Sequence, residues 1–221
     1  MGNEFKIWQK SRKFKQILSG IAFLFVLIGG WFWPLLGFFI PFCMVIGITI
    51  AFFKGRKWCD WLCPRGSFYD AYMSPISLKK GIPKIFKSEA FRIAILFLLM
   101  AIMMSQLVRF WPHPEKIGKF FVIMLATTTV IGVILAILFH SRSWCMICPI
   151  GSLGHWVGRG KYPLKIDSKL CTTCKLCEKV CPVGIAPYRY KKEKIEFMTD
   201  SDCLKCNLCV KACPTHALYF K

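Results

Sequence analysis

The stretch QILSGIAFLFVLIGGWFWPLLGFFIPFCMVIGITIAFF, residues 16–53, contains no charged side chain over 38 positions. A single helix of that length would measure about 57 Å, roughly twice the hydrocarbon thickness of a bilayer. Pro34 lies near its middle, where a proline interrupts a helix. We therefore predict two membrane-spanning helices, at about 17–33 and 36–53, joined by a tight hairpin.

Two further apolar runs follow the first pair. Ile93–Val108 is short for a span, but Arg92 and Arg109 at its ends can extend their charged heads toward water. Phe120–Phe139 has the length of a complete span. The sequence thus predicts an α-helical membrane protein with four transmembrane helices. The alternative is four buried helices of a soluble protein. We divide the chain into a basic N-terminus (1–16), a membrane domain (17–157) and a soluble tail (158–221).

The charge distribution predicts the topology. The chain has 31 Lys and Arg against 11 Asp and Glu, a net charge of +20, which by itself is also typical of nucleic-acid-binding proteins. However, 28 of the 31 basic residues fall in 1–16, 54–92 and 141–221, and 3 fall in 109–119. The positive-inside rule then places both termini in the cytoplasm of a bacterial or archaeal inner membrane. We expect the first span to be an uncleaved anchor, and no nucleic-acid partner.

The tail contains two copies of one cysteine pattern. Each copy reads C-x2-C-x2-C-x3-C-P, which is typical of two [4Fe–4S] clusters whose fourth cysteine ligates the other cluster. Structural zinc is the alternative, but it favours paired C-x2-C units. The pattern predicts that cluster I is held by Cys171, Cys174, Cys177 and Cys213, and cluster II by Cys203, Cys206, Cys209 and Cys181.

Residues 165–221 resemble a bacterial-type two-cluster ferredoxin on these motifs. The resemblance implies one-electron transfer and two halves, each built from short strands and a helix. Residues 165–166 and 194–197 would be strand segments that lead into the cysteine runs. The tail is more basic than ferredoxins of this type usually are, which suits an anionic lipid surface or an acidic partner.

A second cysteine motif is repeated in the membrane domain. The segments WCDWLCPRGSF (58–68) and WCMICPIGSL (144–153) each follow the second helix of a predicted hairpin. Two repeated hairpins of the same orientation imply a pseudo-two-fold axis along the membrane normal. That axis would bring Cys59, Cys63, Cys145 and Cys148 together as a third metal centre: a [4Fe–4S] cluster, a [2Fe–2S] cluster or a single ion. The alternative is that these cysteines only end helices. We expect Trp58 and Trp144 to be interfacial anchors.

Four spans, two such motifs and a two-cluster tail together resemble the NapH-like polytopic membrane ferredoxins, to which the NosR and MauN membrane parts are related. This resemblance implies the electron-transfer subunit of a quinol dehydrogenase or oxidoreductase complex, with membrane lipid, quinone and a redox partner subunit as partners. The second motif, one residue shorter than usual, departs from the family. Two alternatives remain: a membrane reductase that serves maturation or activation of a metalloenzyme, and a structural anchor.

The quinone site has two candidate positions. His113 and Glu115 are the only His–carboxylate pair of the predicted outer loop, and a histidine exchanges protons near neutral pH. Alternatively, the site lies near the cysteine motifs, with residues 66–88 as one wall. That segment is either an interfacial segment or an ordinary loop. We expect His140 to be a helix C-terminal cap. Since the predicted spans contain no ionisable residue, a proton pump is not expected.

Overall fold

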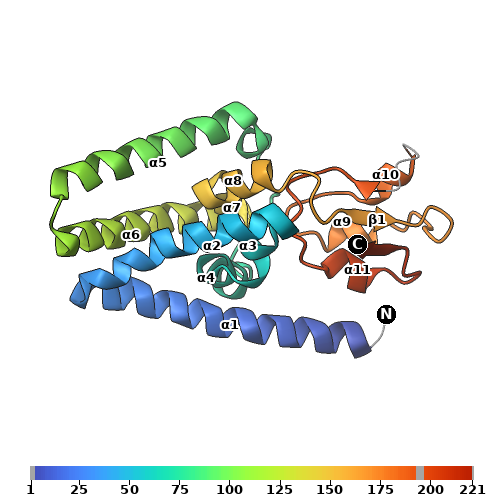
Figure 1. The fold of residues 1–221 in the computed structure, drawn as a ribbon. Coiled ribbons are helices and arrows are strands. Elements are labelled where there is room, and N and C mark those ends of the chain that lie inside the picture. The colour runs from blue at the N-terminus through green and yellow to red at the C-terminus, as the bar shows by residue number, and fades with distance from the viewer. Residues whose placement is uncertain (1–2, 193–196, 221) are drawn as a thin grey trace.

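The computed structural model describes residues 3–192 and 197–220, and it contains four long apolar helices. These are α1 (Asn3–Phe32), α2 (Phe39–Lys54), α5 (Glu89–Phe110) and α6 (Pro114–Leu138). Each is long and apolar enough to cross a membrane, which confirms the four predicted helices. Figure 1 shows the tail and both chain termini at one end of the helical part, and the α5–α6 connection at the other. Since α1 begins at Asn3, most of the basic N-terminal segment is an extension of the first helix.

The turn between α1 and α2 lies against α6. A short 3₁₀ helix (η1, Pro34–Phe38) begins at the proline that interrupts the apolar run. Here Gly37 meets Gly118 of α6 so closely that a Cβ added at Gly118 would lie 2.2 Å from the Pro34 carbonyl oxygen. The missing side chains therefore allow the turn between α1 and α2 to contact α6 closely.

This contact predicts the effect of a methyl group. Gly118→Ala is expected to lower stability by about 1–3 kcal/mol, because the backbone of η1 would have to move. Gly154→Ala is the matched control, since its Cβ would meet only ordinary contacts at 3.6 and 3.8 Å. The thermal unfolding midpoint in detergent, followed by tryptophan fluorescence, checks this. Equal midpoints for the two variants would show that the glycine contact does not limit packing.

Short helices follow α2 and α6 at the end of the bundle nearest the tail. They are α3 (Lys57–Trp61), α4 (Pro64–Phe68), the π-helical turn η2 (Tyr69–Met73), the 3₁₀ turn η3 (Lys84–Lys87), α7 (Ser143–Ile147) and α8 (Pro149–Val157).

Residues 66–88 are neither a purely interfacial segment nor an ordinary loop. Phe68 and Tyr69 are buried, and the Phe68 ring lies 5.4 Å from that of Phe23 in α1. Ile76, Leu78 and Ile85 are exposed. The first part of the segment is therefore core, because its aromatic side chains pack between the long helices.

The tail is a small α+β unit. Its sheet has the order β2-β1-β3, with all pairs antiparallel: β1 (Leu164–Ile166), β2 (Phe197–Met198) and β3 (Leu218–Phe220). Its helices are α9 (Leu176–Lys179), α10 (Tyr188–Lys192) and α11 (Leu208–Ala212). The strand expected at 165–166 is part of β1. Of the strand expected at 194–197, residues 194–196 lie outside the described residues, and Phe197 begins β2.

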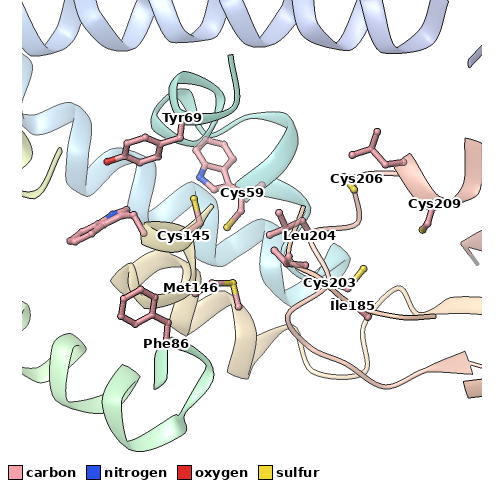
Figure 2. Packing of buried hydrophobic residues seen from close by; sticks show 14 of the residues in the cluster. Cys59, Tyr69, Phe86, Cys145, Met146, Ile185, Cys203, Leu204, Cys206 and Cys209 are labelled. Carbon is pink, nitrogen blue, oxygen red and sulfur yellow. The ribbon is translucent and has the colours of Figure 1, made fainter. Parts of the chain in front are cut away.

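One hydrophobic core joins the two parts of the chain. It runs from Phe23 in α1, through Cys59 and Cys145, to Leu164 and Leu218 in the tail sheet. Figure 2 shows Cys203, Cys206 and Cys209 of the tail on the other side of Cys59 from Cys145. The tail is therefore packed against the membrane motifs.

Candidate metal centres

The eight tail cysteines line two cavities. One contains Cys171, Cys174, Cys177 and Cys213. The other contains Cys181, Cys203, Cys206 and Cys209. Each cavity thus receives three thiols from one cysteine run and the fourth from the other run, as the spacing predicts for crossed ligation.

The backbone of the two cysteine runs is also repeated. Thr173 and Lys205, each just before the second cysteine of a run, have positive φ angles of 59° and 54°. Lys175 and Asn207 repeat this at 62° and 64°, each just before a short helix. Successive amides in such conformations turn toward one side, where they can donate to an anion. Beside them, the Ile185 amide donates to Cys181 Sγ at 3.4 Å. Thiol groups and amide donors of this kind fit a [4Fe–4S] cluster.

The four membrane cysteines meet at one cavity. Cys59 and Cys145 lie on α3 and α7, while Cys63 and Cys148 are the N-cap residues of α4 and α8. All four line a cavity with about 730 Å³ of space, part of it open to the surroundings. Figure 2 shows the sulfur atoms of Cys59 and Cys145 between Tyr69 and Met146. The two motifs, 82 or more residues apart, therefore present their thiols to one space.

Two arginines join the motifs in a reciprocal way that the sequence analysis missed. Arg56 Nη2 donates to the Cys145 carbonyl at 2.6 Å, and Arg142 Nη1 donates to the Cys59 carbonyl at 2.7 Å. Each arginine stands three positions before the first cysteine of its own motif. The repeat is therefore R-x-W-C-x(2–3)-C-P-x-G-S. This longer repeated pattern could have identified the two arginines from the sequence alone.

The glycines of the repeat have matching surroundings. A Cβ at Gly66 would lie 2.6 Å from the Cys59 carbonyl oxygen, and one at Gly151 would lie 2.4 Å from that of Cys145. Because each glycine has no side chain, the helix that follows the second cysteine of the motif can pack directly against the backbone of the first cysteine. This brings both cysteines of a motif to the same cavity.

The indole groups of the motif tryptophans face the protein interior. Trp58 and Trp144 are 8% and 5% exposed, so the prediction that they are interfacial anchors is wrong. Both line the cysteine cavity, and in the described part of the chain neither indole Nε1 has a hydrogen-bond partner. A buried donor without an acceptor is costly. Sulfide and thiolate sulfur accept hydrogen bonds, so the cavity fits an anionic iron–sulfur cluster.

The cysteine side chains of each set are arranged around a cavity, and they do not converge closely enough to coordinate a single metal ion. Within residues 3–192 and 197–220, no three His, Cys, Asp or Glu side chains stand close enough together to hold a single metal ion. This applies to the tail sets as well as to the membrane set.

Arg142 is held beside the cysteines by two carboxylates. Arg142 pairs with Asp60 at 3.1 Å and with Asp70 at 2.6 Å, and Arg12 of α1 joins the same two carboxylates. Burial would raise the pKa of Asp70, but Arg142 and Arg12 together lower it below its ordinary value. The carboxylate therefore stays ionised and fixes Arg142 beside the cysteines.

Asp202, directly before Cys203, connects the tail to the helical part of the chain. Its carboxylate accepts from Arg56 at 3.0 Å, from Arg92 at 2.8 and 2.9 Å, and from His155 Nδ1 at 2.8 Å. Burial opposes ionisation, but these donors lower the pKa of Asp202 well below its usual range. The guanidinium of Arg56 thus connects the second membrane motif directly to the cluster II loop.

The histidines with predicted roles, His113 and His140, have different surroundings in the structure. His113 is the N-cap residue of α6, Glu115 lies in the first turn of that helix, and both are exposed. The α5–α6 connection lies at the end of the bundle away from the tail (Figure 1). His140 is not a charged helix cap: Phe139 is the C-cap of α6, and His140 Nδ1 accepts from the Arg142 amide at 3.3 Å. Burial lowers the pKa of His140, which favours its neutral form.

The cysteine sets coincide with two known domain families. Residues 36–83 and 121–167 match the family described as a 4Fe-4S binding domain, and these ranges contain the four membrane-motif cysteines. Residues 170–218 match the 4Fe-4S dicluster domain, and this range contains the eight tail cysteines. The chain is therefore a 4Fe–4S ferredoxin-type protein that carries four helices able to cross a membrane.

The chain is also similar to two proteins of Methanocaldococcus jannaschii. It is 29% identical to the uncharacterized protein MJ0749 over 197 residues, which cover 79% of this chain and 74% of that protein. It is 25% identical to the uncharacterized protein MJ0750 over 156 residues, which cover 64% of this chain and 65% of that protein. No solved structure matches the chain.

Proposed function

We propose that the chain is a membrane-bound iron–sulfur electron-transfer subunit, of the NapH-like quinol dehydrogenase type, that connects a quinone pool with a redox partner protein. The observation that carries this proposal is the order of the cysteine sets. The cluster I set includes the exposed Cys174, the cluster II set includes three buried cysteines, and the membrane set lies next to the long helices. This order leads from the protein surface to the membrane.

The contacts between neighbouring sets support the same order. Trp61 of α3 donates to the Lys205 carbonyl at 3.2 Å, inside the cluster II run. Arg56 bonds both the Cys145 carbonyl and Asp202, beside Cys203. Electron transfer needs closely packed and rigid neighbours, and buried ion pairs of this kind fix relative positions.

A third iron–sulfur cluster at the membrane set completes the proposed path. It would be held by Cys59, Cys63, Cys145 and Cys148. The two orphan indole donors and the flanking arginines suit its negative charge. Iron–sulfur clusters supply one-electron redox chemistry over a wide range of potentials. Oxidation of one quinol releases two electrons, which leave singly, and two protons, which pass to water; reduction of a quinone is the reverse.

The proposed topology has both termini in the cytoplasm of an inner membrane. The tail, the N-terminus and the basic segments gather at one end of the long helices (Figure 1). Only three basic residues lie in 109–119 at the other end. The positive-inside rule favours this orientation.

Anaerobic electron exchange tests the proposed function. Protein in lipid nanodiscs, reduced with dithionite and freed of excess, is mixed with a soluble quinone. We expect the quinone to restore the iron–sulfur absorbance of the oxidised protein. In the reverse experiment, the corresponding quinol should bleach the iron–sulfur absorbance of protein that starts oxidised. A protein that responds to dithionite but to neither quinone nor quinol would refute the quinone-linked role.

A further inference from the structure

A second cavity lies beside the membrane cysteines, between the long helices. It is lined by residues of α2, α4, α5, α6, α7 and α8, and it has about 510 Å³ of space, part of it open to the surroundings. Four of its side chains are methionines: Met44, Met100, Met103 and Met124. Methionine adapts its shape to apolar ligands. The apolar character of this lining suits an apolar ring or chain.

Among the described residues that line this cavity, Arg65 is the one charged residue. Its Nε donates to Tyr69 Oη at 3.2 Å, and its guanidinium carbon lies 4.6 Å from the centre of the Trp144 ring. Its Nη2 is buried without a hydrogen-bond partner among the residues that the structure describes, and none of the ion pairs found there includes Arg65. A buried guanidinium nitrogen in this state calls for an acceptor.

The position of Arg65 connects the two cavities. Arg65, Trp144 and Cys148 line both the methionine cavity and the four-cysteine cavity. A group that accepts a hydrogen bond from Arg65 Nη2 would therefore lie next to a proposed cluster ligand. Among the described residues of the lining, Thr128 carries the one hydroxyl group, and this hydroxyl donates to the Met124 carbonyl of its own helix.

We infer that the methionine cavity binds the ring of a membrane quinone, with Arg65 Nη2 donating to one ring oxygen. This inference rests on the proposed function and gives its quinone a place. A quinone carbonyl is a neutral acceptor that needs one donor, and its ring and tail suit the apolar lining. A phospholipid phosphate carries a full charge and favours several donors, but this lining provides one cationic side chain. The site lies at the cysteine end of the bundle, not at His113 and Glu115.

Arg65→Met tests the inference, because it keeps an unbranched apolar stem and removes the guanidinium donor. We expect the KM for quinone, measured by reoxidation of the dithionite-reduced protein in nanodiscs, to rise about tenfold or more. Iron content and the dithionite-reduced spectrum should stay at native values. Arg65→Lys should restore part of the affinity. Arg109→Met is the matched control, since Arg109 is exposed at the far end of α5.

Photolabelling with an azidoquinone gives a second readout that does not depend on turnover. We expect native protein to be labelled on the α5 and α6 methionine segments, and Arg65→Met to lose this label. If native protein exchanges electrons with quinone but Arg65→Met keeps its KM and its label, this site is wrong and the proposed function stands. If native protein does not exchange electrons with quinone, the proposed function itself fails. Loss of a bound phospholipid, with unchanged quinone KM, would identify a lipid site instead.

Discussion

Anaerobically purified protein is expected to contain about 12 iron atoms per chain, and the double variant Cys59→Ser/Cys145→Ser about 8, because each [4Fe–4S] cluster holds four irons. The double variant removes one of the two thiols from each membrane motif, so neither motif retains both of its cysteine ligands. Serine is close to cysteine in size, so the surrounding core should keep its packing. Iron and acid-labile sulfide measured on the same samples check the prediction.

The eight irons expected to remain in the variant serve as an internal control for the tail. They would show that the tail has folded and holds its clusters, so a loss of four reports on the membrane motifs alone. Cys43→Ser is the matched control, because Cys43 of α2 lines the same cavity but belongs to neither motif. It should keep about 12 irons. About 8 irons in native protein and variant alike would contradict the third cluster, and the motifs would then be helix-ending turns.

Local patterns made the long helices and the tail motifs predictable. The uncharged run 16–53 and its central Pro34 predict a helical hairpin from chain length and proline geometry alone. The cysteine spacing predicts shared cavities because three ligands come from one short run. Apart from the fourth cysteine of each tail cavity, which comes from the other run, these features depend on neighbours within a few residues. The described residues accordingly include four long apolar helices, and the tail matches a 4Fe-4S dicluster domain.

The centre of the molecule was not predictable in the same way, because its contacts join distant parts of the chain. Arg142 and Cys59 are 83 residues apart, and Arg56 and Asp202 are 146 apart. In sequence, Arg56 and Arg142 look like ordinary positive-inside charges at helix ends. Their burial depends on which helix ends meet in space. The same holds for Trp58 and Trp144, whose aromatic character suits an interface equally well.

Asp202→Asn is expected to produce the largest loss of stability among single substitutions outside the cysteines, about 3–5 kcal/mol. In the native protein one carboxylate serves Arg56, Arg92 and His155, and both arginines are 1% exposed. An amide keeps the shape but supplies no negative charge, so two buried guanidinium groups would remain uncompensated. The thermal unfolding midpoint in nanodiscs should fall by several degrees, and protease should cut more rapidly between α8 and β1.

Asp167→Asn is the matched control, because within the described part of the chain the Asp167 carboxylate accepts from the nearby amides of Lys169 and Leu170 alone. Its midpoint should stay close to native. Iron analysis of the same samples separates loss of docking from loss of clusters, since Asp202 adjoins Cys203. A variant with native iron, a lower midpoint and slower quinone-dependent reoxidation would show that this one carboxylate holds the tail in its electron-transfer position. Native stability and native protease resistance would mean that the shared hydrophobic core alone holds the tail in place.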